Sequence, residues 1–203
     1  MKKSTRVLAI FLVVILALGL GACSKKVPTP KAIEEVYNNE FKNAPEWVTK
    51  NCSCYNKDKK AAPAICGVGS VGGSRNVSLM RTTATARART ELARSLQVKV
   101  KAMLKDYQGS TTGGQNFGTA AADDQFVVDV SKQITSTTLS GTELADTWIS
   151  PNETFYVLVV MNVDKFKGAV SKMSNLSEEV RKAVEDRADK AFEELDVETQ
   201  AQN

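Results

Sequence analysis

The sequence contains no histidine, and aromatic residues make up only 6% of the chain. Without histidine, acid–base chemistry would depend on carboxylates. The candidate acids for such chemistry are scattered along the chain: Asp123, Asp124, Asp129 and Asp146. A catalytic thiol would also lack its usual base. We therefore expect a protein that is not an enzyme and that has no catalytic residues and no metal ligands.

Long apolar runs are absent except for one, from Val7 to Leu20, which follows a basic start with no acid. A membrane-spanning helix needs about 20 apolar residues. This run is shorter, and the positive charge before it is typical of a signal peptide. It ends in Leu20-Gly21-Ala22-Cys23, a sequence that resembles the lipobox of bacterial lipoproteins. We therefore expect export of the chain and cleavage between Ala22 and Cys23.

Lipidation of Cys23 follows from the same pattern. We expect diacylglycerol on its thiol and an acyl chain on its new amino terminus, and no other cofactor. The membrane is then a partner through this lipid anchor. Ser24, in place of an aspartate, favours the outer membrane. Whether the protein faces the periplasm or the cell surface stays open.

Net charge is nearly absent once the signal segment is removed. The full chain has 27 basic and 23 acidic residues. Residues 1–22 carry three bases and no acid, so the mature chain retains 24 basic groups against 23 acidic ones. This balance gives no electrostatic footprint for nucleic acid. The remaining 181 residues suffice for one domain with tails.

Cysteines are few, and lipidation of Cys23 leaves Cys52, Cys54 and Cys66 in a compartment that oxidises thiols. Cys52 and Cys54 are separated by one residue and are poorly placed to bond each other. We expect a disulfide from one of them to Cys66, and the choice between the two stays open. Closing a loop of about a dozen residues would contribute roughly 3 kcal/mol. Three thiols without histidine match structural zinc sites poorly.

The residues after Cys23 predict a tether over 24–30, with two prolines, and then a short helix over 31–41. The apolar residues of this helix, which we expect to lie on the domain, are Ile33, Val36, Tyr37 and Phe41. Trp47 is expected to be a buried anchor in the loop that follows.

A predicted strand over residues 64–72 contains Gly67-Val68-Gly69-Ser70-Val71-Gly72, which matches the dinucleotide fingerprint G-x-G-x-x-G. The sequence after it predicts about 30 helical residues, with no strand and no ribose-binding acid about 20 residues on. Nucleotide binding is therefore rejected. We interpret the glycines as positions where another part of the chain crosses the strand closely.

The longest predicted helix covers residues 77–107. Its small or apolar residues recur every three or four positions: Thr85, Ala88, Leu92, Leu96, Val100, Met103 and Tyr107. Four bases lie near its opposite side: Arg87, Arg94, Lys101 and Lys105. They form either an interaction face or an ordinary solvated surface. The acidic segment 178–198 could pair with them, within or between chains.

Residues 108–122 are rich in glycine and predict a flexible loop. A second helix is expected around residues 126–134. Strands over 142–149 and 154–163 form a predicted hairpin, with these core residues: Leu144, Trp148, Tyr156, Leu158 and Val160. A third helical region begins near Asp164, breaks at 174–175 and continues from Ser177, its expected N-terminus, to about residue 197.

Several short motifs in this order resemble the Lpp-twenty family of bacterial outer-membrane lipoproteins. Besides the lipobox they are Ala44-Pro45-Glu46-Trp47-Val48, Gly67-Val68-Gly69, Ala88-Arg89-x-x-Leu92-Ala93, Leu139-Ser140-Gly141, Thr147-Trp148 and Tyr156-Val157-Leu158-Val159. The resemblance covers roughly residues 45–164. It does not extend to the 52–66 loop or the acidic C-terminal helix. It implies a compact α+β domain, a role in the cell envelope, with some relatives linked to motility, and no catalytic residues.

Together these patterns predict an α+β fold in which one N-terminal strand and a C-terminal hairpin form a small, mainly antiparallel sheet. Two or three helices pack on it, and a C-terminal helix is added. The expected segments are a signal peptide (1–22), a lipidated cysteine with tether and short helix (23–44), an Lpp-twenty-like domain (45–170) and an acidic helix and tail (171–203).

For function, we expect a non-catalytic, lipid-anchored outer-membrane lipoprotein with a structural or protein-interaction role. It would form a homo-oligomer or bind an envelope protein, with no nucleic acid and no small-molecule substrate identified. The alternative is a periplasmic lipoprotein that activates a cell-wall synthase. A ligand-binding module is a third hypothesis, which the small residues of the strand and helix disfavour because they indicate tight packing.

Overall fold

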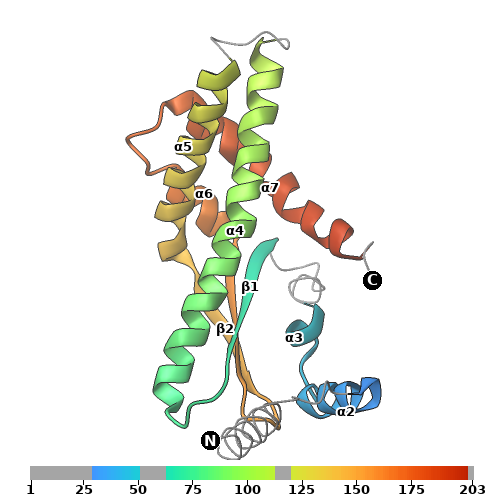
Figure 1. The fold of residues 1–203 in the computed structure, drawn as a ribbon. Coiled ribbons are helices and arrows are strands. Elements are labelled where there is room, and N and C mark those ends of the chain that lie inside the picture. The colour runs from blue at the N-terminus through green and yellow to red at the C-terminus, as the bar shows by residue number, and fades with distance from the viewer. Residues whose placement is uncertain (1–28, 51–62, 113–119, 201–203) are drawn as a thin grey trace, which may run out of the picture. The chain divides into compact units, whose positions relative to one another are not determined.

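The computed structural model describes residues 29–50, 63–112 and 120–200. The chain divides into two compact units, residues 1–38 and 39–203. Its elements are α2 (Pro30–Glu40), α3 (Glu46–Lys50), β1 (Ala64–Val71), α4 (Val77–Thr112), α5 (Ala120–Thr138), the 3-10 helix η2 (Leu139–Gly141), β2 (Glu143–Ile149), β3 (Phe155–Asn162), α6 (Val163–Val170) and α7 (Glu178–Gln200) (Figure 1).

The three described strands form one antiparallel sheet in the order β1-β3-β2. β3 is therefore central, and β1 and β2 are its two edges. Val68 of β1 lies opposite Leu158 of β3, and a bulge interrupts β2 between Leu144 and Asp146. With helices packed on this sheet, the predicted α+β class, its N-terminal strand and C-terminal hairpin, and its added C-terminal helix are confirmed.

Both faces of β3 are covered, which corrects the predicted hairpin core. Leu158 and Val160 are buried against Trp47, as expected, in a smaller cluster on one face. The larger core uses the alternate residues Phe155, Val157, Val159 and Met161. Leu144 was predicted to be buried but is 44% exposed. Side chains alternate across a strand, so a central strand needs two apolar sets, whereas an edge strand can leave residues in solvent.

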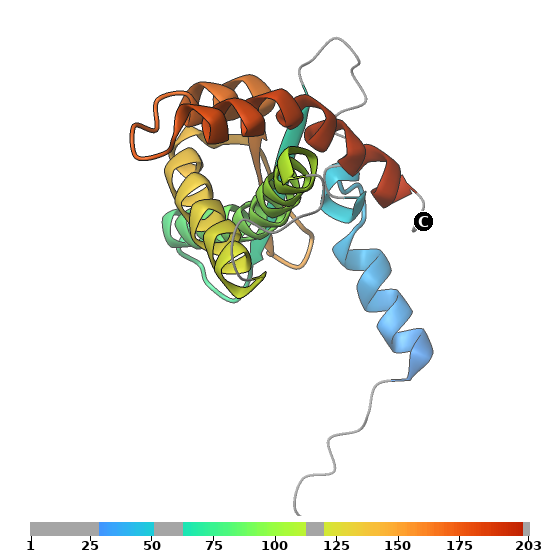
Figure 2. The same cartoon turned by 90° about the horizontal axis from the view of Figure 1, so that it is seen from above.

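Helix α4 packs on the sheet with its N-terminal half and on α5 and α7 with its C-terminal half (Figures 1 and 2). The side chain of Asn76 begins it by accepting a hydrogen bond from the backbone N–H of Leu79. The buried stripe includes Ala84, Ala88 and Leu92. The helix continues to Thr112, and α5 begins at Ala120. The predicted loop over 108–122 is thus wrong at both ends, because only residues 113–119 lie outside the described helices.

Helix α7 belongs to the larger core. Ser177 precedes it and accepts a hydrogen bond from the N–H of Val180, so the expected N-terminus is confirmed. Phe192 of α7 is fully buried, with its ring centroid 5.2 Å from that of Phe166 in α6. The segment predicted as an addition after residue 170 therefore supplies part of the same apolar core as the sheet.

Ile33, Val36 and Tyr37 of α2 are each more than half exposed. The expected contact of this helix with the domain stays a prediction. The prediction for Trp47 is confirmed, since it is 7% exposed. Across the described ranges, no helix is both long and apolar enough to cross a membrane.

Candidate functional site

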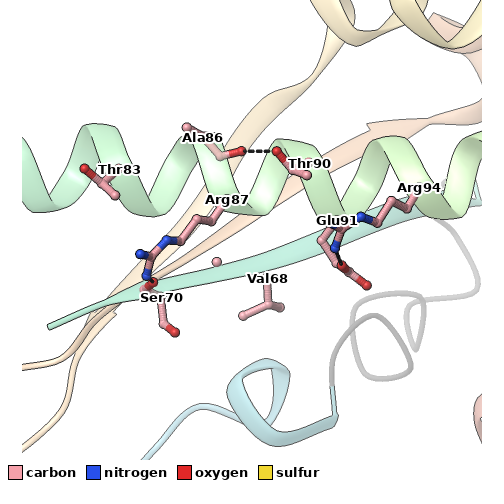
Figure 3. Close-up of a pocket in the computed structure, with 9 residues that line it drawn as sticks. Val68, Ser70, Thr83, Ala86, Arg87, Thr90, Glu91 and Arg94 are labelled. Carbon is pink, nitrogen blue, oxygen red and sulfur yellow. Dashed lines mark hydrogen bonds and ion pairs between the residues drawn. The ribbon is translucent and has the colours of Figure 1, made fainter.

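The candidate site is a groove between the edge strand β1 and one flank of α4 (Figure 3). It exists because the two elements approach very closely. A Cβ atom on Gly67 would lie 2.1 Å from the carbonyl oxygen of Ala88, and one on Gly69 would lie 2.2 Å from that of Ala84. Only glycine permits this distance. The interpretation of these glycines as a close crossing is therefore confirmed, and the crossing element is α4.

The outer edge of β1 faces this groove. The Nη1 atom of Arg87 donates a hydrogen bond of 2.6 Å to the carbonyl oxygen of Ser70. In Figure 3 the guanidinium reaches down from α4 to the strand. Among the described strands β1 pairs with β3 alone, and this carbonyl points away from the sheet. A side chain thus occupies a position that a neighbouring strand would otherwise fill.

The groove has a volume of about 490 Å³. From β1 it is lined by Val68, Gly69 and Ser70, and from α4 by Thr83, Ala86, Arg87, Thr90, Glu91 and Arg94. The Thr90 hydroxyl is turned back onto its own helix, where it donates to the carbonyl of Ala86. Small side chains on the helix flank leave space above the strand edge, with charged groups at the rim.

The charges of the groove are two arginines and one glutamate. Arg94 lies 3.5 Å from Glu91, and the two side chains are 74% and 54% exposed. Such an exposed ion pair contributes little to stability, because water and salt screen it. The two arginines therefore leave a net positive charge at the rim, and Arg94 is accessible to a partner's carboxylate.

The predicted interaction face is only partly brought together. Arg87 and Arg94 line the groove, but Lys101 and Lys105 do not. Lys105 instead lies 3.5 Å from Asp124 of α5. A basic stripe that looked continuous on the helix is divided because the C-terminal half of α4 packs beside α5.

The acidic C-terminal helix does not pair with that stripe through its described side chains. Asp189 pairs with Lys167 of α6, at 2.6 Å. A second ion pair of α7 involves one of its bases, since Arg187 lies 2.7 Å from Asp106 of α4. The suggested pairing of α7 acids with Arg87, Arg94, Lys101 or Lys105 within one chain is not found among the described residues.

A second group of polar contacts lies on the opposite sheet face. The indole N–H of Trp47 donates to a carboxylate oxygen of Asp146 at 2.8 Å. The Tyr156 hydroxyl donates to Glu40, also at 2.8 Å. Burial would raise the pKa of Glu40, but hydrogen bonds from Tyr156 and neighbouring hairpin residues lower it overall. Burial, followed by the bond to Glu40 and its charge, raises the pKa of Tyr156.

The cysteine predictions fall mainly on residues that the structure does not describe. Ala22, Cys23, Cys52 and Cys54 all lie outside the described ranges. Cys66, in β1, is buried and disulfide-bonded. Its partner must lie outside those ranges, because they contain no other cysteine. The choice between Cys52 and Cys54 stays a prediction.

The four scattered acids have separate surroundings. Asp124 pairs with Lys105, Asp129 accepts a hydrogen bond from Gln125, and Asp146 accepts one from Trp47. Asp123 is half-buried near the start of α5. Within the described ranges, no three metal-ligating side chains gather closely enough to hold an ion.

The sequence alone did not predict that the backbone of Ser70, at the outer edge of β1, takes part in the site. The sequence does carry a signal for it: glycines two apart on a strand and alanines four apart on the next helix predict a close crossing. That signal does not reveal the sheet order. The open side of β1 depends on which strand is central, and only the structure shows that it is β3.

Comparison with known proteins gives one family. The family model described as LPP20 lipoprotein matches residues 45–162, which include α3, the whole sheet, α4 and α5. The match contains both walls of the groove. No curated protein matches the chain.

Proposed function

The chain belongs to the LPP20 lipoprotein family, and we propose that it is a non-catalytic lipoprotein held to the outer membrane by lipid on Cys23. In this proposal residues 1–22 are a signal peptide, and cleavage after Ala22 makes Cys23 the first residue. Residues 24–44 connect the lipid to the matched domain. The role of the domain is structural, through contacts with other envelope proteins or with further copies of itself.

One observation carries the anchoring part of the proposal. A lipobox-like sequence ending at Cys23 stands ahead of a domain whose family is named for lipoproteins. The family match begins at residue 45 and so does not include the lipobox. The basic start and the apolar run before the lipobox supply the remaining parts of an export signal.

The interaction role is supported by the chemistry of the groove. Its lining offers strand backbone, hydroxyls and exposed charges, which are groups that bind a partner's main chain and side chains. The chain has no histidine to serve as a general base.

Lipidation is tested with Cys23→Ala. The unchanged chain should incorporate a labelled fatty acid and sediment with the membrane fraction. Cys23→Ala should incorporate none and appear unprocessed or soluble. Cys54→Ala is the matched control, since it removes a cysteine but leaves the lipobox intact, and it should still be labelled. The proposal fails if Cys23→Ala remains in the outer-membrane fraction.

A separate variant tests whether the lipoprotein is sorted to the inner or the outer membrane. Ser24→Asp should keep the lipidated chain in the inner membrane, because the outer-membrane assignment depends on a residue other than aspartate after the lipidated cysteine. Separation of the two membranes on a density gradient gives the readout. An unchanged distribution of Ser24→Asp would contradict this sorting argument and leave lipidation standing.

The structural role is tested by mass and by crosslinking. We expect the lipoprotein to crosslink in cells to itself or to envelope proteins. The mass of the detergent-extracted protein then distinguishes an oligomer from a monomer. A monomer that crosslinks to one cell-wall synthase would overturn the structural role in favour of an activator.

A further inference from the structure

The outer edge of β1 has backbone groups available for another strand. In an antiparallel strand the N–H and C=O of one residue point to the same side, and alternate residues point to opposite sides. The Ser70 carbonyl points outward, as its bond from Arg87 shows. The backbone N–H and C=O of Val68, two residues earlier, must therefore point outward as well. Among the described residues, no hydrogen bond accounts for the outward groups of Val68 or for the N–H of Ser70.

We infer that this edge binds an extended peptide segment of a partner protein by strand addition, with an acidic side chain of the segment meeting Arg94. The inference deepens the proposed interaction role and rests on it. Strand addition takes its affinity from main-chain hydrogen bonds and its specificity from pockets for alternate side chains. The backbone groups of Val68 and Ser70 supply the hydrogen bonds, and the groove above them receives the side chains.

Arg87 shows how the edge is used in the absence of a partner. Its guanidinium donates to the Ser70 carbonyl at 2.6 Å, as the N–H of an added strand would. Arg87 is exposed, so it can leave this carbonyl at small cost and turn to a carboxylate of the incoming segment. The bond from Arg87 thereby hinders pairing of this edge with strands that carry no acidic side chain. A segment that offers a carboxylate to Arg87 can still pair with it.

Charge determines the chemistry of the segment. Arg87 and Arg94 line the groove from the helix side, and Glu91 neutralises only one of them. A glutamate or aspartate on the side of the segment that faces α4 would complete the pairing. A lysine there would meet two arginines, and like charges held close together are unfavourable.

The same charges argue against a second copy of this chain as the occupant. Antiparallel pairing of β1 with β1 of another copy would place α4 of both copies on one face of a continuous sheet. Arg87 and Arg94 of each copy would then meet across the two-fold axis. The closely packed arginines would repel, with only the two Glu91 side chains to offset them.

The test uses the full-length lipoprotein in detergent micelles and three fluorescent seven-residue peptides. The first alternates threonine or valine with glutamate, the second has lysine in place of glutamate, and the third is the first with alternate backbone nitrogens methylated. We expect the glutamate peptide alone to bind, measured by fluorescence anisotropy at low and high salt. Hydrogen exchange should show new protection in the segment that contains Val68 and Ser70.

Charge reversal locates the site on α4. Arg94→Glu should weaken binding of the glutamate peptide about fivefold to tenfold, because an attraction becomes a repulsion. Arg81→Glu is the matched control: Arg81 is also exposed on α4 but does not line the groove. It should leave the affinity unchanged, and thermal unfolding of both variants checks that each still folds.

Three results would each overturn the inference. One is that no peptide binds. The second is equal binding of the methylated or lysine peptide. The third is that Arg94→Glu binds as well as the unchanged chain. Self-association of the lipoprotein that depends on Arg87 and Arg94 would assign the edge to a second copy. None of these results affects the fatty-acid labelling of Cys23, so failure of the inference is distinguishable from failure of the proposed anchoring.

Discussion

Two glycines determine how closely α4 can approach the sheet. In Gly67→Ala the new Cβ would meet the carbonyl oxygen of Ala88 at 2.1 Å, so the helix or the strand must shift. We expect the free energy of unfolding to fall by about 2–3 kcal/mol, because the atom that is met belongs to backbone and cannot turn away. Urea unfolding followed by circular dichroism measures the change.

Gly109→Ala is the control for this substitution. Gly109 lies in α4 with nothing within 4 Å of a new Cβ, so alanine should stabilise the helix by about 0.5–1 kcal/mol. If Gly67→Ala and Gly109→Ala unfolded at the same urea concentration, α4 would not be held against β1 in the way described.

The hydrogen bond between Tyr156 and Glu40 makes stability depend on pH. The pKa of Glu40 is lowered in the folded chain from its ordinary 4.5. Its contribution to stability is therefore fully present above about pH 4.5 and is lost as pH falls through the lowered value. We expect the stability difference between the unchanged chain and Glu40→Gln to be constant near neutral pH and to shrink in acid. Thermal unfolding from pH 3 to 7 tests this.

Tyr156 provides a further check at alkaline pH. Its pKa is raised from 10.0, so the hydroxyl contributes stability that is complete below pH 10 and is lost as pH rises above it. Tyr156→Phe should remove this alkaline dependence and reduce the acid dependence assigned to Glu40, part of which the hydrogen bonds from the hairpin residues retain. An acid dependence of unchanged size in Tyr156→Phe would show that the Tyr156 hydroxyl does not lower the pKa of Glu40.

At the scale of elements, α7 is part of the folded core. Phe192 is completely buried against Phe166 of α6. Phe192→Ala should lower the free energy of unfolding by about 3–5 kcal/mol, since it removes a large buried ring and leaves a cavity. Chemical unfolding gives the value. Glu193→Ala, the exposed neighbour, should change it by less than about 0.5 kcal/mol. Similar small effects for both would mean that α7 is detached in solution.

The elements themselves could largely be predicted from the sequence. The three-to-four-residue spacing located α4, and apolar runs around a turn located the hairpin, because these patterns arise from local geometry. Boundaries were less predictable. The glycine-rich composition predicts a loop at Gly109, but a glycine in the exposed part of a long helix costs only about 1 kcal/mol, which packing against α5 and α7 outweighs.

The groove could not be predicted in the same way, because it depends on contacts between distant segments. Arg87 and Arg94 were singled out together with Lys101 and Lys105, since all four lie near one side of a helix. Whether such a side faces a strand edge or another helix is decided by the tertiary packing of α4. Likewise, Leu144 has the hydrophobicity of a core residue but lies on an edge strand.

For the whole molecule, lipidation and disulfide formation together fix the number of free thiols. The chain has four cysteines, and Cys66 is disulfide-bonded. If Cys23 carries lipid and the bridge joins Cys66 to either Cys52 or Cys54, the purified lipoprotein has one free thiol when denatured without reductant. After reduction it has three, because the thioether on Cys23 does not reduce. Thiol titration in guanidinium gives both numbers.

The titration separates the two modifications. Four thiols after reduction would mean that Cys23 is unmodified, and none before reduction would mean that the third cysteine is also bonded, for example between two chains. Cys52→Ala and Cys54→Ala then identify the partner of Cys66. The variant that keeps the bridge shows no free thiol before reduction. The variant that breaks it shows two, because both its remaining partner candidate and Cys66 are exposed on denaturation.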